Sequence, residues 1–142
     1  MTFVSSPAEA DVILLWLKPS IRPLFPADDS PLRVNLSACA MDMKYVNTLT
    51  AKKPTVLVIN HANPFAINEV YNGQIRTRFN GITATFGVDS KASLDVVSGK
   101  FNPTGKMPFT TPVRQQAVEK NKEGEGYALF KFGESSGYKQ LQ

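Results

Sequence analysis

The chain has very few of the side chains that form disulfides or bind metals. Among its 142 residues there is one cysteine, Cys39, and one histidine, His61. A single cysteine excludes an intrachain disulfide, and the surrounding "LSACAMDM" predicts a buried small hydrophobe rather than a nucleophile. His61 has no second histidine with which to share a metal ion. We therefore expect neither a metal nor a cofactor.

Long apolar runs and clustered charge are also missing. No segment approaches the roughly 18 consecutive apolar residues of a membrane span. The opening "MTFVSSPAEADV" lacks both the charged region and the apolar stretch of a signal peptide. The 16 basic and 12 acidic residues give a net charge of +4, but the basic residues are spread out, which argues against a nucleic-acid surface. We expect no membrane span, no signal peptide and no nucleic-acid partner.

Three apolar segments predict β-strands. The run "DVILLWL" (Asp11–Leu17) is continuously apolar after its first residue, which is typical of a buried parallel strand. "TVLVIN" (Thr55–Asn60) is rich in β-branched residues, and "GITATF" (Gly81–Phe86) fits the same pattern. Met107-Pro108-Phe109 is predicted to run extended and to lead into a fourth strand at the sheet edge.

Helical patterns separate these strands. In residues 38–53, Met41, Tyr45 and Leu49 recur every four residues and predict one inward helix face. Residues 64–72 form a second, short candidate helix. This alternation predicts an α/β three-layer sandwich, with a mostly parallel central sheet of at least four strands and helices on both faces. No linker or repeat divides the chain, so residues 1–142 are expected to form one domain.

The third predicted helix, residues 89–99, has recognisable start and stop signals. Asp89 or Ser90 is the expected cap, and Gly99 the expected end. A Lys91–Asp95 pair should lie on its exposed side. The inward positions are expected to be Leu94 and Val97.

The stretch "SGKFNPTGKMPFTTP" (98–112) invites comparison with a phosphate-binding loop. Such a loop needs two glycines separated by four residues, then Lys and Ser or Thr. Here five residues separate Gly99 from Gly105, and Lys106 is followed by Met107. We interpret the stretch as a scaffold, with a turn at Asn102–Gly105. Its lysines, Lys100 and Lys106, are expected to face solvent.

Candidate acids lie in a proline-rich loop after the first predicted strand. Asp28 and Asp29 stand at the centre of residues 18–33, near the end of the sheet at which open α/β folds bind ligands. No glutamate occurs between Glu9 and Glu69. The alternative is a solvated turn, which the turn preference of aspartate favours.

Four ordered segments resemble the C-terminal α/β-sandwich domain of glycoside hydrolase family 3, the β-glucosidase and exo-glucanase family. The most specific is "FNPTGKMPFTTP", which is similar to the family's N-P-S-G-K-L-P-x-T-x-P ending. The others are "EADVILLWL", "LTAKKPTVLVINHANPFAI" and "YALFKFGESSGY". The chain departs from the family at Leu17-Lys18-Pro19, where a Gly-Glu pair is common, and at Gly87-Val88-Asp89, where Gly-Gln-Glu is usual. The closing motif also lacks the usual Gly-Leu-Ser order.

The resemblance implies a domain of a larger enzyme. A (β/α)₈ barrel, in cis or in trans, would supply the nucleophilic aspartate for hydrolysis of a β-linked glycoside. This domain would close one side of the pocket, and a loop such as that of Asp28 and Asp29 would offer the acid. Alone, the chain is expected to be inactive. The sugar and the linkage are not specified by the sequence.

Other side chains have structural interpretations beside functional ones. His61, in "INHANPFA", is a candidate base, but no partner residue is visible, and a supporting role before a helix starting at Pro64 is favoured. Trp16 is expected in the core. Phe25 and Tyr71 suit either sugar contact or packing.

Two further interpretations stay open. One is a free-standing, non-catalytic module that binds a carbohydrate or a protein; it predicts a closed polar surface. The other is a small independent enzyme whose site is the Asp28-Asp29 loop. The domain interpretation instead predicts a bare apolar face and a barrel-coding region upstream.

Overall fold

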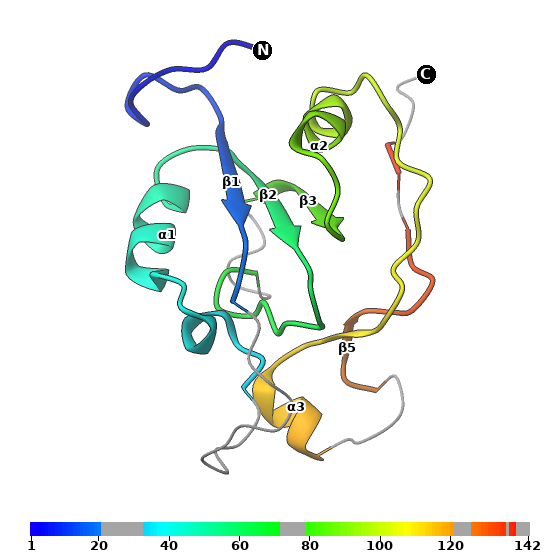
Figure 1. The fold of residues 1–142 in the computed structure, drawn as a ribbon. Helices are drawn as coiled ribbons and strands as arrows, with labels where there is room; N and C mark the ends of the chain where they lie inside the picture. Colours follow the sequence, from blue (N-terminus) through cyan, green and yellow to red (C-terminus); the bar gives the residue numbers. More distant parts are fainter. Residues whose placement is uncertain (21–32, 72–78, 121–125, 136, 139–142) are drawn as a thin grey trace.

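Three strands form a parallel sheet in the order β1-β2-β3. They are β1 (Ile13–Leu17), β2 (Thr55–Asn60) and β3 (Phe79–Thr85). Figure 1 shows the sheet between helices α1 (Met43–Thr50) and α2 (Ser90–Val97). The predicted α/β sandwich is thereby confirmed, with the three predicted strands adjacent and parallel. This computed structural model describes residues 1–20, 33–71, 79–120, 126–135 and 137–138.

The predicted fourth strand does not join the central sheet, which has three strands among the described residues. Met107–Phe109 is not a strand, and the following β4 (Thr111–Pro112) pairs antiparallel with β5 (Ala128–Phe130) in a separate sheet. Pro108 and Pro112 lack the backbone N–H that a continuous ladder requires. Two other short elements, the 3₁₀ helix η1 (Leu36–Cys39) and α3 (Gln115–Lys120), were not predicted.

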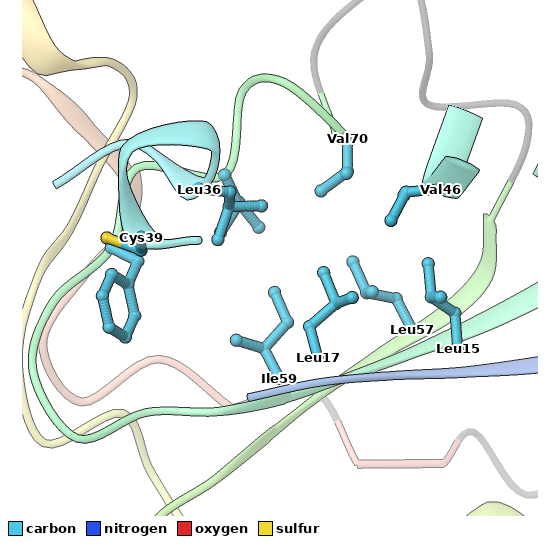
Figure 2. Close-up of a cluster of buried hydrophobic side chains, with 10 residues drawn as sticks. Leu15, Leu17, Leu36, Cys39, Val46, Leu57, Ile59 and Val70 are labelled. Atoms are coloured by element: carbon cyan, nitrogen blue, oxygen red, sulfur yellow. The ribbon is translucent and has the colours of Figure 1, made fainter. Parts of the chain in front are cut away.

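One hydrophobic core joins the sheet to the layer that carries η1 and α1. Figure 2 shows strand side chains such as Leu17, Leu57 and Ile59 pointing toward Leu36 and Val70. Alternate strand residues face this layer because side chains of a β-strand alternate between its two faces. Cys39 is buried in the same cluster, which confirms its predicted role as a small hydrophobe.

Helix α1 exists where predicted, but it presents a different face to the core. Its buried residues are Val46 and Thr50, whereas Tyr45 is 59% exposed. The helix begins at Met43. Asp42 caps it, because its side chain accepts a hydrogen bond from the Tyr45 N–H at 3.0 Å. Met41 therefore precedes the helix and packs on the core independently, so it does not share a helical face with Tyr45.

The short helix predicted for residues 64–72 is absent from the described part of that segment, residues 64–71. Ala66 instead forms an isolated parallel bridge with Asn35, and its N–H donates to the Val34 carbonyl at 2.9 Å. Phe65, Ala66 and Ile67 are all buried. Three consecutive buried residues suit a chain that crosses the core, because a helix at the surface buries only one side.

Helix α2 follows its predicted signals. The Asp89 carboxylate caps it by accepting from the Lys91 N–H at 2.8 Å, and Lys91 pairs with Asp95 at 3.2 Å. The Lys91 hydrogen bond, with Lys100 nearby, lowers the pKa of Asp95. Gly99 follows the helix with φ of 77°. The predicted inward positions Leu94 and Val97 are half-buried.

We expect the variant Gly99→Val to lose about 1 kcal/mol or more of unfolding free energy, since a β-branched residue is strained at positive φ. Lys106→Ala should change it by less than about 0.5 kcal/mol, as is usual at exposed positions. Equilibrium urea denaturation compares the two. Tolerance of valine at residue 99 together with unfolding by Lys106→Ala would refute the scaffold interpretation of this stretch.

The predicted turn at Asn102–Gly105 is not formed. Asn102 instead holds the C-terminal segment, because its side-chain oxygen accepts from the Tyr138 N–H at 2.7 Å. Further along, the Met107 N–H donates to the Glu134 carbonyl at 2.9 Å. The side-chain oxygen of Asn102 is thus hydrogen-bonded to a distant backbone N–H rather than to a group in a local turn. The stretch thus clamps the chain end, and its interpretation as a scaffold stays a prediction.

No described helix is long and apolar enough to cross a membrane.

Candidate functional site: a cavity at the carboxyl ends of β2 and β3

A cavity of about 300 Å³ lies beside the carboxyl ends of β2 and β3. Its wall on the sheet side comes from Ile59 of β2 and from Ile82 and Ala84 of β3. Part of the stretch 103–111 and part of the C-terminal segment, including Phe130, close it from the other side. The site therefore forms where parallel strands end, which is where open α/β sheets commonly bind ligands.

Two residues that follow the strands face this cavity. His61 comes directly after β2, and its backbone N–H donates to the Thr85 carbonyl at 2.7 Å. Phe86 comes directly after β3 and is followed by Gly87, whose N–H donates to the side-chain oxygen of Asn60 at 2.9 Å. Asn60 thus fixes the turn that presents Phe86 to the cavity.

Aromatic rings surround His61. The centroid of its ring lies 5.7 Å from that of Phe86 in a stacked arrangement, and 5.5 Å from Phe109 edge-on. Phe65 lies 5.9 Å away. Phe109 is thus packed against His61 and Phe86, the residues that follow β2 and β3. His61 is only 7% exposed, so these rings exclude most water from it.

The environment keeps His61 neutral. Burial lowers the pKa of its ring, and this outweighs the raising effect of the contact with the Asn63 carbonyl. Nδ1 lies 3.4 Å from that carbonyl oxygen. A proton on Nδ1 is favoured there, which leaves Nε2 as a hydrogen-bond acceptor. Within the described ranges, no acid hydrogen-bonds to the ring, so the structure gives His61 no partner for base catalysis.

Stability should fall as the pH drops below about 6.5, the ordinary pKa of histidine in an unfolded chain. Because the folded pKa of His61 is lowered, the unfolded chain binds this proton first. The stabilisation is complete above pH 6.5 and is lost as the pH falls through the folded pKa. Urea denaturation between pH 7.5 and pH 5 measures the slope, and His61→Gln should flatten it. An unchanged slope in His61→Gln would show that other groups cause the effect.

One residue of the cavity wall carries a buried, unsatisfied hydroxyl. Thr111, in β4, is 1% exposed, and its Oγ1 has no hydrogen-bond partner among the described residues. Lys106, Glu134 and Ser135 complete the polar lining together with Thr83 and His61. Glu134 is the one carboxylate among the described residues that line the cavity. The described part of the lining therefore does not contain a pair of acids.

The other predicted site residues are distributed as follows. Asp28, Asp29 and Phe25 lie outside the described residues. Tyr71 stacks on Phe130 with centroids 6.0 Å apart, so it is a packing residue. Trp16 is half-buried within β1.

The two lysines of the stretch 98–112 are exposed, as predicted, and one of them also belongs to the cavity. Lys100 lies 3.6 Å from Asp95, whereas Lys106 contributes to the cavity wall.

Sequence reasoning missed Thr111, Glu134 and Phe86 as cavity residues. They come from three segments that are distant in sequence, and the cavity exists only once the C-terminal segment is clamped against the stretch 103–111. The available signal was the resemblance of both "FNPTGKMPFTTP" and "YALFKFGESSGY" to segments of one family.

Large apolar side chains are exposed after β3 and in the C-terminal segment. Phe86 is 42% exposed and Val88, two residues further on, is 52% exposed. Phe132, in the C-terminal segment, is 68% exposed. Exposed large apolar side chains of this kind are candidates for contact with another domain.

The fold is that of an α/β-sandwich domain with a cavity at the carboxyl end of its parallel sheet. The sequence model of the glycosyl hydrolase family 3 C-terminal domain matches residues 2–138. The chain belongs to this family, which confirms the resemblance drawn from its motifs.

Curated relatives cover the chain almost completely, but they are much longer than it is. "Probable beta-glucosidase C" of Aspergillus flavus is 33% identical over 96% of the chain and 22% of the relative's length. Its namesake in Aspergillus oryzae is 30% identical over the same shares. "Beta-glucosidase C" of Emericella nidulans is 33% identical over 86% of the chain. The chain thus spans about a fifth of the relatives it matches. No solved structure matches it significantly.

Proposed function

We propose that this chain is the pocket-completing domain of a β-glucosidase-like glycoside hydrolase. It packs against a (β/α)₈ barrel, in cis or in trans, and that barrel supplies the nucleophile. The observation that carries the proposal is the family match over residues 2–138, together with relatives named β-glucosidases of which the chain spans 22%. A β-linked glycoside is the proposed substrate of the complete enzyme.

The chemistry of the described residues fits a domain that assists catalysis by another domain rather than one that carries the whole reaction. Retaining glycoside hydrolysis uses two carboxyl groups roughly 5 Å apart. The described cavity lining offers one, Glu134. Asp28 and Asp29, which lie outside the described residues, stay our candidates for an acid that this domain contributes to the joint pocket. The exposed Phe86, Val88 and Phe132 are our candidates for part of the surface that meets the barrel.

A chimera tests the proposal. In the A. flavus relative, the region that matches this chain is either deleted or replaced by this chain. We expect the deletion to abolish hydrolysis of p-nitrophenyl β-glucoside and the replacement to restore part of it. A folded replacement chimera, verified by circular dichroism, that is no more active than the deletion would contradict the proposal. Asp28→Asn and Asp29→Asn in an active chimera then test the acid.

A further inference from the structure

A two-stranded ribbon forms one side of the cavity. It consists of residues 107–112 and 128–134, and we call it the C-terminal ribbon. Its two halves are joined by the pairing of β4 with β5. They are also joined by two hydrogen bonds, from the Met107 N–H to the Glu134 carbonyl at 2.9 Å and from the Gly133 N–H to the Met107 carbonyl at 2.8 Å. Among the described residues, no β-ladder joins this ribbon to the central sheet.

Aromatic side chains attach the C-terminal ribbon to the rest of the domain. The centroid of the Phe109 ring lies 5.5 Å from that of His61 and 5.6 Å from that of Phe86. At the other half of the ribbon, Phe130 stacks on Tyr71 with centroids 6.0 Å apart. The cavity of about 300 Å³ lies between the ribbon and the ends of β2 and β3. A segment that is held by few side chains beside a cavity opens at lower cost than the core.

His61 is the titratable residue in this attachment. It is 7% exposed, and the three rings around it, Phe65, Phe86 and Phe109, offer no anion to an imidazolium. A charge that is buried without a partner is costly. The attraction between a cation and an aromatic face offsets part of this cost, but burial lowers the pKa of His61 overall.

Two of the three rings can move away from His61. Phe65 is fully buried in the core, whereas Phe86 is 42% exposed and Phe109 is half-buried. Water therefore reaches an imidazolium at residue 61 when the outer rings separate from it. Phe109 lies inside the C-terminal ribbon, so its departure moves the ribbon as well.

The other charged groups near His61 do not neutralise an imidazolium. The Glu69 carboxylate accepts from a backbone N–H of η1 at 2.9 Å, and Asp89 caps α2. Lys106 and Glu134 line the same cavity as His61, but neither is hydrogen-bonded to its ring among the described residues. The Glu134 carboxylate instead accepts from a backbone N–H of its own segment at 2.8 Å.

We propose that His61 is an acid-sensitive latch, whose protonation releases Phe109 and opens the C-terminal ribbon away from the ends of β2 and β3. Opening widens the cavity and gives water access to its apolar walls. The inference does not rest on the proposed enzyme function. All the residues of the latch belong to this chain, so the chain alone is expected to show the effect.

Native-state hydrogen exchange of the ¹⁵N-labelled chain tests the latch. The amides of Met107 and Gly133 report opening of the ribbon, and the amide of Leu57, a fully buried residue of β2, reports global unfolding. We expect both ribbon amides to be less protected than Leu57. Their protection should depend little on urea, because a local opening exposes little surface.

The pH dependence of this exchange is the signature of the latch. Below about pH 6.5, the ordinary pKa of histidine, the protection of the ribbon amides is expected to fall by up to about tenfold per pH unit, because opening takes up one proton. The measurement runs from pH 7.5 to pH 5 and is corrected for the intrinsic exchange rates.

Four variants separate the latch from other causes. His61→Gln should make the protection of the ribbon amides independent of pH. Phe109→Leu should lower their protection at pH 7.5 and flatten its pH dependence, so either variant alone tests the coupling. The matched control Phe101→Leu changes a ring of the same stretch that is 57% exposed and should have neither effect. Glu134→Gln should leave the pH dependence in place. Thermal unfolding verifies that each variant is folded.

Three results would overturn the inference. The first is a protection and a urea dependence of the ribbon amides equal to those of Leu57, which would mean that the ribbon opens only when the whole domain unfolds. The second is an unchanged pH dependence in folded His61→Gln or Phe109→Leu. The third is a pKa of His61 at or above about 6.5 in an NMR titration of its ring, which would mean that the phenylalanines stabilise the imidazolium.

Discussion

The purified chain is expected to hydrolyse p-nitrophenyl β-glucoside no faster than the uncatalysed reaction in buffer. Glycosidic bond hydrolysis by enzymes requires a nucleophile or base as well as an acid. Glu134 is the one carboxylate in the described lining of the cavity, and His61 is neutral and encircled by phenylalanines. A lone acid accelerates a reaction on the order of 10²–10⁴-fold. A complete enzyme accelerates it by roughly 10⁶-fold or more.

The assay requires a chain purified free of host glucosidases, with Asp28→Asn and Asp29→Asn prepared in parallel. Turnover at the rate of an enzyme that disappears in either variant would contradict this prediction. That result would support the small independent enzyme, with its site in the loop of residues 18–33.

Phe65→Ala should be the most destabilising single substitution of the described aromatic side chains. Among the described residues, Phe65 is the largest fully buried side chain, at 0% exposure, and it belongs to the hydrophobic core cluster. Removing a buried phenylalanine ring costs about 3–5 kcal/mol, a large part of the roughly 5–15 kcal/mol by which domains are stable. Urea denaturation should show a midpoint far below that of the unchanged chain.

Phe132→Ala is the matched control, since the same ring is removed from a side chain that is 68% exposed. We expect a change within about 0.5 kcal/mol. Equal losses in the two variants would mean that the core lies elsewhere than the cluster around Phe65.

The strands were predictable because their signal is local. β2 has the predicted bounds, Thr55–Asn60, since a run of β-branched residues bounded by Pro54 and Asn60 leaves little choice. β1 and β3 shifted by one or two residues. The cap at Asp89 and the stop at Gly99 were likewise readable, because caps act over one helical turn.

Elements that depend on distant partners were not predictable. Residues 64–71 have a helical composition, yet Ala66 bridges to Asn35 and the segment crosses the core. Asn102 and Gly105 suit a turn, but Asn102 instead holds Tyr138, 36 residues away. In both cases a tertiary hydrogen bond overrides the local preference.

The candidate site, too, was predictable only in part. The sequence indicated His61 as a supporting residue, and its burial among three rings agrees with that interpretation. It gave no sign that Thr111 would be buried in the cavity wall, because that position depends on the pairing of β4 with β5. The Asp28-Asp29 hypothesis lies outside the described residues and stays a prediction.

The central claim is that this domain works together with a barrel. The most direct measurement is the genomic sequence upstream of the Met1 codon and in its flanking genes. We predict a coding region for a (β/α)₈ barrel with a nucleophilic aspartate, in frame with this chain or in an adjacent gene. Translation that starts at Met1, with no barrel encoded nearby, would contradict the claim and favour a free-standing binding module.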